Sequence, residues 1–175
     1  KRPYVILKWA ESFDGFISPI NKKNKRPFWI SNKFSRQLVH KWRSQEHGIL
    51  IGGQTYIDDS PILNSRLWDK NDPKKFVLTN NTILKDSKFL KINYKSKLSA
   101  KQICEELYKN DIQSVIVEGG TKTLTTFIND GIWDEARIIQ SSKTIMEGTK
   151  SPKIHGKIKS ELELSNDRIK FIVPN

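Results

Sequence analysis

Paired glycines follow two apolar, strand-like runs that lie far apart in the chain. Gly52-Gly53 comes directly after the run 48–51, and Gly119-Gly120 follows the run 115–117 after one carboxylate, Glu118. Glycine lets the backbone turn sharply and approach a ligand closely, and a helix that begins at such a turn directs unpaired N–H groups at an anion. A simple tight turn is the alternative for either pair alone. Together, the two pairs indicate a ligand that carries phosphate.

A third cluster of reactive side chains lies at 55–66, between the two glycine pairs. It holds adjacent carboxylates at Asp58 and Asp59 and a guanidinium at Arg66. An arginine can bind a phosphate through paired hydrogen bonds, and a carboxylate can move a proton. The carboxylates could also cap a helix or a turn. Neither GxGxxG nor GxxxxGK[ST] occurs in the chain, so a bound nucleotide would require a scaffold other than the Rossmann or P-loop one.

Strand-like and helix-like segments alternate along the chain and must position these residues. Strands are expected at 4–10, 48–51, 76–78, 89–92, 115–117 and 136–139, with a turn at Asp14-Gly15 and a short return at 16–17. A C-terminal hairpin is expected at 162–173, around Asn166-Asp167. This order predicts an α/β fold whose sheet is mostly parallel and has an antiparallel edge.

Three helices are expected between these strands. One begins after Ser31 as an N-cap, one after Ser99, and one runs from Thr121 to Gly131. The first should be amphipathic, with an apolar face of Phe34, Leu38 and Trp42 and a basic face of Lys33, Arg36, His40 and Arg43. His40, His47 and His155 are dispersed in the sequence, and none is expected to be catalytic.

The composition is that of one globular domain. The 175 residues are 36% hydrophobic and 29% charged, which argues against a disordered or fibrous chain. No apolar stretch reaches the roughly 18 to 20 residues of a membrane span, so a cytoplasmic location without membrane contact is expected. Cys104 is the only cysteine, and neither an internal disulfide nor a cysteine-based zinc site is expected. Because the chain begins at Lys1 rather than at a methionine, we expect a domain cut from a longer chain.

The net charge of +12 raises nucleic acid as an alternative partner. The surplus is regional, because residues 1–48 hold 11 Lys and Arg against 3 Asp and Glu. The segment from Lys22 to Arg26, followed by Phe28-Trp29, is where basic and aromatic residues are interleaved as a nucleic-acid groove would require. A solvated loop and helix face explain the same charge. We therefore expect no nucleic-acid partner and keep a basic nucleic-acid-binding module as the hypothesis from another class.

Several ordered motifs resemble one known family. They run from Lys8-x-Ala10-x-Ser12-x-Asp14-Gly15 through Trp29-Ile30-Ser31, Arg43, Gly52-x-x-Thr55-x-x-Asp58-Asp59-x-Pro61-x-Leu63-x-x-Arg66 and Val117-Glu118-Gly119-Gly120 to Trp133-Asp134-Glu135. This order resembles the C-terminal reductase domain of the bifunctional riboflavin biosynthesis deaminase/reductase, the RibD family. The resemblance implies a dihydrofolate-reductase-like three-layer α/β/α fold for a single domain, 1–175, in which the central sheet is mixed. It also implies an NADPH cofactor, a homodimer, and a deaminase domain N-terminal to this one in the full-length chain.

The activity that the resemblance implies is reduction of the ribosyl group of 5-amino-6-(5-phosphoribosylamino)uracil. The expected mechanism is ring opening of the ribose to an imine, hydride delivery to C1′, and proton supply assisted by Asp59. Substrate contacts are expected from Arg43, Leu63, Arg66 and Glu118. Cofactor contacts are expected from Ala10, Trp29, Thr55, Asp59, Thr79, Gly120, Thr121, Lys122, Thr123, Leu124, Thr125 and Thr126. No metal-binding residue is expected.

Several positions depart from the pattern of this family, among them Glu11 and Phe13 beside Asp14 and Ser31 after Trp29-Ile30. Pro27 stands where a serine is expected to touch the substrate, and Thr79 stands where an aspartate is common. The zinc signature of the deaminase half does not occur in this sequence, so we expect no deaminase activity from it. The sequence leaves open a related reductase that acts on a diaminopyrimidinone ribosyl phosphate or on a pteridine-like substrate.

Overall fold

A computed structural model describes residues 1–20, 28–80, 84, 86–94 and 98–175. Its helices are α1 (Lys33–Gln45), α2 (Gly53–Asp59), α3 (Ala100–Lys109) and α4 (Thr121–Asn129). Its strands are β1 (Tyr4–Glu11), β2 (Phe16–Pro19), β3 (Gly48–Gly52), β4 (Lys74–Leu78), β5 (Phe89–Ile92), β6 (Ser114–Val117), β7 (Glu135–Ser141), β8 (Gly148–Lys150), β9 (Lys157–Leu164) and β10 (Asp167–Val173). All strands and helices expected from the sequence are present, and α2 and β8 are added to them.

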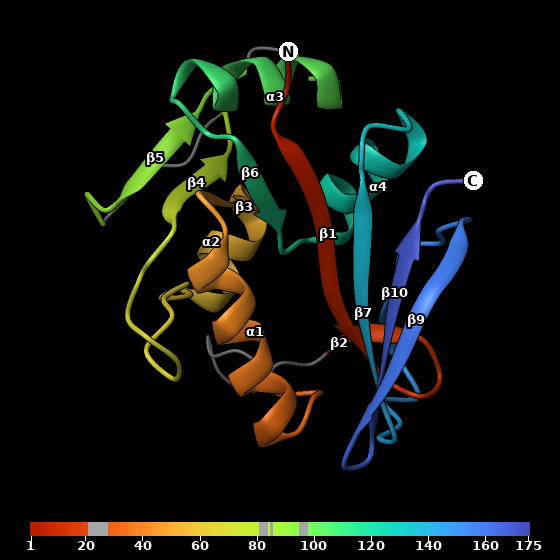
Figure 1. The fold of residues 1–175 in the computed structure, drawn as a ribbon. Helices are drawn as coiled ribbons and strands as arrows, with labels where there is room; N and C mark the ends of the chain where they lie inside the picture. The colour runs from red at the N-terminus through yellow and green to blue at the C-terminus, as the bar shows by residue number, and fades with distance from the viewer. Residues whose placement is uncertain (21–27, 81–83, 85, 95–97) are drawn as a thin grey trace.

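An eight-stranded mixed sheet forms the centre of the fold, in the order β5-β4-β3-β6-β1-β7-β10-β9 (Figure 1). The first six strands of this order are parallel, because each of their pairings is parallel. Strand β10 runs antiparallel to both β7 and β9. The expected mostly parallel sheet with an antiparallel C-terminal hairpin is confirmed.

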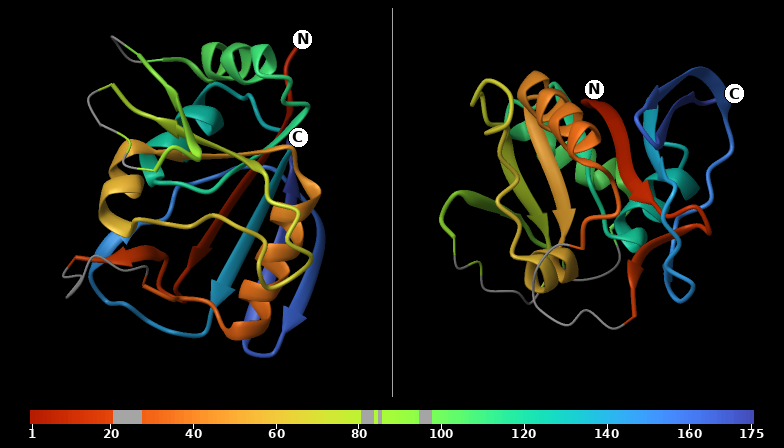
Figure 2. Two further views of the ribbon diagram at one scale, coloured as in Figure 1. Left: turned by 90° about the vertical axis from the view of Figure 1, so that its left-hand side faces the viewer. Right: turned by 90° about the horizontal axis from the view of Figure 1, so that it is seen from below.

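Helices cover both faces of this sheet, which gives three layers (Figures 1 and 2). Alternate side chains of β1 enter different cores because successive residues of a strand point to opposite faces. Val5 and Leu7 pack with α3 and α4, whereas Ile6 packs with α1. All three are at most 1% exposed. A strand buried on both faces has no polar side, which is why these strands read as unbroken apolar runs.

The first turn of α1 differs from the expectation in its cap. The N-cap is Asn32 rather than Ser31, and the side-chain oxygen of Asn32 accepts hydrogen bonds from the amides of Phe34 and Ser35. The predicted faces of this helix were also partly wrong. Phe34, expected on the apolar face, is 47% exposed, whereas His40, expected on the basic face, is 4% exposed. The helix therefore turns part of its polar face inward.

The short segment after Asp14-Gly15 does not pair with β1 in a hairpin. It is β2, which pairs antiparallel with β8 in a separate two-stranded sheet. The carboxylate of Asp14 accepts backbone hydrogen bonds from Ile145 and Met146, which fastens the turn to the segment that leads into β8. In the part of the chain that the structure describes, no helix is long and apolar enough to cross a membrane.

Candidate active site

A cavity of about 1560 Å³ lies where β1, β3 and β6 end. Parallel neighbours end at the same edge of a sheet, so the loops after these strands meet there. Every residue expected to contact substrate or cofactor lines this cavity: Ala10, Trp29, Arg43, Thr55, Asp59, Leu63, Arg66, Thr79, Glu118, Gly120, Thr121, Lys122, Thr123, Leu124, Thr125 and Thr126. The structure thus brings together side chains that are spread over more than a hundred positions of the sequence.

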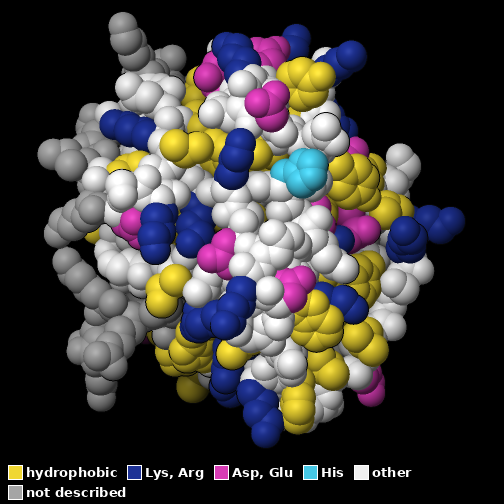
Figure 3. Space-filling view, turned by 60° about the vertical axis from the view of Figure 1, so that its left-hand side comes forward, with side chains coloured by type: hydrophobic (Ala, Val, Ile, Leu, Met, Phe, Trp, Pro, Cys, Tyr) yellow, Lys and Arg dark blue, Asp and Glu magenta, His cyan; other side chains and the backbone are white. Residues whose placement is uncertain are grey.

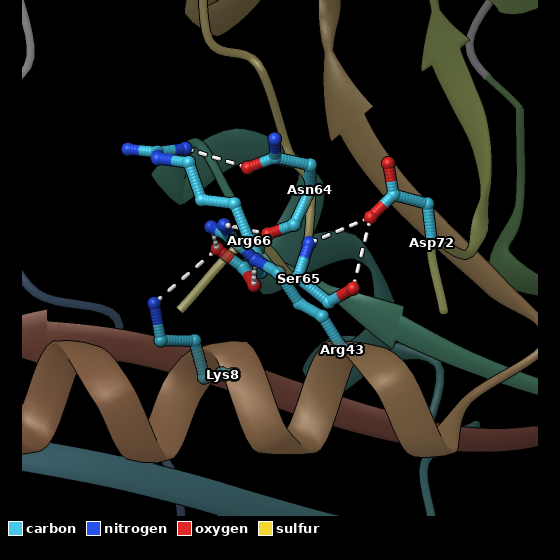
Figure 4. Close-up of polar contacts among 7 residues, drawn as sticks. Lys8, Arg43, Asn64, Ser65, Arg66 and Asp72 are labelled. Atoms are coloured by element: carbon cyan, nitrogen blue, oxygen red, sulfur yellow. Dashed lines mark hydrogen bonds and ion pairs between the residues drawn. The ribbon is translucent and has the colours of Figure 1, made fainter. Parts of the chain in front are cut away.

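A buried carboxylate, Glu118, lies at the floor of the cavity between two cations. The guanidinium of Arg43 donates from Nε to Oε1 at 2.7 Å and from Nη2 to Oε2 at 2.8 Å. The Nζ of Lys8 donates to Oε2 at 3.3 Å. Only 6% of the Glu118 side chain and 13% of each partner is exposed. In Figure 4, Lys8 from β1 and Arg43 from α1 point toward the same carboxylate.

The two cations keep Glu118 ionised. Burial alone would raise the pKa of this carboxyl group, but the charges and hydrogen bonds of Arg43 and Lys8 outweigh it and lower the pKa to about 2. Burial also lowers the pKa of Lys8, and the nearby Arg43 lowers it further, while Glu118 opposes both. At neutral pH the cluster therefore offers a ligand both hydrogen-bond acceptors and N–H donors.

The N-terminus of α4 also lines the cavity and suits an anion. Helix α4 begins at Thr121, and its N-cap, Gly120, provides no side-chain hydrogen bond to the first turn. The first N–H groups of a helix lack partners within it and carry its positive end. Gly52 approaches this turn closely, since its amide donates to the carbonyl of Gly119 at 2.9 Å. The two glycine pairs predicted from the sequence thus meet at one place.

Two of the expected cofactor contacts have contrasting surroundings. Trp29 is 53% exposed at the cavity wall, with the guanidinium of Arg36 5.1 Å from its ring centre. Leu124 belongs to α4 but is fully buried in the core against Phe127 and its neighbours. An exposed indole can stack on a ring system, whereas a fully buried leucine can only hold the helix in place.

Three residues of this site were missed by the sequence reasoning. Lys8 opens the family motif and is a lone cation inside an apolar strand, but no contact was assigned to it. Asn64 contacts both substrate-facing arginines, which nothing in the sequence indicated. His40 lines the cavity with 4% of its surface exposed, and among the described residues its Nδ1 has no hydrogen-bond partner.

The buried His40 predicts a pH dependence of stability. Burial and the charges of Arg43 and Arg66 lower its pKa from 6.5 to about 4. The imidazole gains a proton on unfolding below about pH 6.5, so its stabilising effect is complete above that pH and is lost as the pH falls toward 4. We expect His40→Gln to lose less unfolding free energy than the wild type between about pH 7 and 5, measured by urea titration. His155→Gln is the control, because His155 is exposed. If the unfolding free energy of all three proteins changes equally with pH, the prediction is wrong.

The basic segment proposed for nucleic acid, Lys22 to Arg26, lies outside the described residues, as does Pro27. On the face shown in Figure 3, Lys and Arg side chains are interspersed with acidic and hydrophobic ones. A polymer-binding surface instead gathers basic side chains into a patch or stripe. Nothing on this face favours the nucleic-acid hypothesis.

The three layers, the sheet order and the glycine turn before α4 at the carboxyl edge define a dihydrofolate-reductase-like fold. Dihydrofolate reductase from Enterococcus faecalis, solved in complex with NADP(H), aligns with 98% of this chain and 97% of its own at a TM-score of 0.65 and 15% identity. The chain belongs to the RibD C-terminal domain family, whose model matches residues 3–170.

Two further similarities agree with this family. Riboflavin biosynthesis protein RibD from Aquifex aeolicus is 28% identical over 85% of this chain and 49% of its own length. The structure of a diaminohydroxyphosphoribosylaminopyrimidine deaminase/5-amino-6-(5-phosphoribosylamino)uracil reductase from Thermotoga maritima has a TM-score of 0.82 at 24% identity. The alignment covers 99% of this chain and 57% of the Thermotoga maritima chain. The chain therefore spans about half the length of the curated relative that it matches.

Proposed function

We propose that this chain reduces the ribosyl group of 5-amino-6-(5-phosphoribosylamino)uracil to a ribityl group with NADPH, as a step of riboflavin biosynthesis. The observation that carries the proposal is the joining, in one cavity, of a buried Arg43–Glu118–Lys8 cluster and the open N-terminus of α4. The first suits a polar, phosphorylated substrate and the second suits the diphosphate of a dinucleotide. Membership of the RibD C-terminal domain family supports the same reaction.

The residues at the α4 end fit NADPH. The glycines there let the two turns pack closely, and the first-turn amides of 121–123 can donate to a ligand's phosphates. Thr55 and Thr79 lie beside the glycine turns, next to Gly120 and Gly53 respectively, and Ala10 and Trp29 line the same cavity. When bound, NADPH supplies a hydride, and the protein orients the two partners and excludes water around them.

Beside the Glu118 cluster, we assign Arg43 and Arg66 to the substrate phosphate and Leu63 to apolar packing against the substrate. Glu118 stays ionised, so it accepts hydrogen bonds from the amino and ring N–H groups of an aminouracil rather than donating a proton. Lys8 adds donors beside it. Asp59, the last residue of α2, lies at the cavity wall and is our assignment for assisting proton supply.

An Asp59→Asn variant tests that assignment. The amide keeps the shape of the side chain but cannot release a proton, and positioned acid–base groups contribute typically about 100-fold or more to a rate. We expect kcat to fall by about that factor while the Kd for NADPH, measured by calorimetry, changes less than about threefold. An unchanged kcat would remove Asp59 from the mechanism.

The reaction itself is tested by following NADPH oxidation with the purified chain. The deaminated substrate, 5-amino-6-(5-phosphoribosylamino)uracil, is compared with its undeaminated diaminopyrimidinone precursor, because a reductase for the second ring was left open by the sequence. Turnover of the first and not of the second supports the proposed substrate. No turnover with either would overturn the proposed function.

Other parts of the expectation stay proposals. A deaminase domain N-terminal to this one is supported by the bifunctional Thermotoga maritima relative, of which this chain covers 57%. A homodimer and a cytoplasmic location remain predictions from the family resemblance. Sedimentation of the purified chain checks the first of these two.

A further inference from the structure

One residue, Asn64, contacts both arginines of the substrate end (Figure 4). Its backbone carbonyl accepts a hydrogen bond from Nη1 of Arg43 at 3.2 Å. Its side-chain Oδ1 accepts one from Nη1 of Arg66 at 2.5 Å. Arg43 comes from α1 and Arg66 from the loop after α2, so two guanidinium groups from separate elements are held by one residue.

The segment that carries Asn64 is itself fixed in place. The backbone amide and the hydroxyl of Ser65 both donate to Oδ1 of Asp72, at 2.8 and 2.9 Å. Ser65 is fully buried, and Leu63 on the other side of Asn64 is 5% exposed in the hydrophobic core. Burial would raise the pKa of Asp72, but the bonds from Ser65 and the charge of Lys75 lower it, so the anchor is ionised at neutral pH. Asn64 is therefore held from both neighbours.

Counted over the described residues alone, both arginines keep N–H donors that have no hydrogen-bond partner and could bind a ligand. A guanidinium has five N–H groups. Arg43 uses three of them, two on Glu118 and one on Asn64, and Arg66 uses one on Asn64. The amide of Asn64 is neutral, so it orients Arg66 without cancelling its positive charge. A carboxylate at the same position would orient it too, but would compete with an incoming phosphate.

We propose that Asn64 is a positioning residue that sets the spacing and orientation of Arg43 and Arg66 for the phosphate monoester of the substrate. The inference rests on the proposed function, in which these two arginines bind that phosphate. An arginine side chain loses rotamer freedom when it binds, and a residue that already holds it reduces this loss. The effect of Asn64 must then appear in the affinity for the phosphate and not in the chemical step.

Calorimetry with ribose 5-phosphate tests this directly, because this probe carries the phosphate of the substrate without its uracil ring. Asn64→Leu removes the side-chain acceptor, and we expect its Kd to rise about tenfold, as for one hydrogen bond to a charged group. Asn64→Gln keeps the amide but displaces it by one methylene, and we expect a smaller rise. Asn71→Leu is the matched control. Its amide lies on the same loop and donates to the carbonyl of Ser44 instead, so its Kd should stay within about twofold of wild type.

Kinetics separate positioning from a structural role. With the phosphorylated substrate, Asn64→Leu should raise KM about tenfold and change kcat less than about threefold. With the dephosphorylated substrate, the variant and the wild type should have the same KM. Equal losses with both substrates would show a general structural defect and overturn the inference.

The outcomes distinguish the inference from the function on which it rests. If wild type and Asn64→Leu bind ribose 5-phosphate equally, the inference is wrong and the proposed function stands. If the wild type does not bind ribose 5-phosphate, the assignment of the arginines to a phosphate fails and the inference falls with it, while NADPH oxidation with the substrate decides the proposed function separately.

Discussion

A Glu118→Gln variant is expected to lose about 3–5 kcal/mol of unfolding free energy and at least about 100-fold in turnover. The change leaves Lys8 and Arg43 as two neighbouring buried cations without a counter-charge, and such uncompensated charges are far more costly than the intact cluster. Turnover falls because the carboxylate that accepts hydrogen bonds from the substrate is lost and both cations lose their fixed orientation. Urea unfolding and NADPH oxidation at neutral pH measure the two effects.

The pH dependence of this difference follows from the pKa of Glu118. Its folded-state pKa, about 2, is lower than the ordinary value of 4.5. Its stabilising effect is complete above about pH 4.5 and is lost as the pH falls toward 2, so the gap between wild type and variant should narrow in that window. Glu163→Gln is the control, because that carboxylate is 76% exposed in a pair with Arg168. The loss of unfolding free energy in Glu163→Gln should stay below about 1 kcal/mol. A Glu118→Gln protein as stable as wild type at neutral pH would contradict the prediction.

A Gly52→Ala variant is expected to bind NADPH at least about tenfold more weakly than wild type and to lose about 1–3 kcal/mol of unfolding free energy. The backbone of Gly52 is extended, at φ −78° and ψ 154°, so alanine is conformationally allowed there. The obstacle is space, because an added Cβ would lie 2.7 Å from Oγ1 of Thr123 in the first turn of α4. Threonine is stiff about χ1, so the helix turn itself must shift. Calorimetry with NADPH measures the result.

A second substitution distinguishes this steric cause from others. Thr123→Ala removes the oxygen, after which the nearest remaining neighbour of the new Cβ is the amide nitrogen of Gly120 at 3.7 Å, an ordinary contact. We expect the double variant, Gly52→Ala with Thr123→Ala, to bind NADPH within about threefold of Thr123→Ala alone. If the double variant remains as weak as Gly52→Ala, steric contact with Thr123 is not the cause.

The central elements could be predicted because local sequence and tertiary environment agree in them. The run 115–117 is apolar throughout and is a strand buried on both faces, and Ser99 forms a capping box with Gln102 at the start of α3. The glycine pairs predicted turns correctly because the local preference of glycine for turns agrees with its place in the fold. Wherever a residue's local preference matched its surroundings in the fold, the pattern alone was sufficient.

The remaining features depend on contacts between distant residues. Strand β8 has three residues, and its partner β2 lies about 130 positions earlier, so no local pattern indicates the pairing. The inward polar face of α1 was missed because hydrophobic periodicity assumes that a buried face is apolar. Here a cavity lies under the helix, and Arg43 and His40 face it. The pairing of Lys8 with Glu118 likewise follows only from the parallel register of β1 and β6.

The position of β1 in the sheet order has a consequence for the assembly of the chain. This strand comes first in sequence but lies in the interior of the sheet, between β6 and β7, whose registers with it begin at Ser114 and Glu135. Contacts of such long sequence separation form slowly, because a long loop must close before they are gained. While the protein is being synthesised, β1 therefore has no strand partner until β6, more than a hundred residues later, has been made. We expect the apolar side chains of β1 to be exposed over this interval, and exposed apolar segments of that kind favour aggregation.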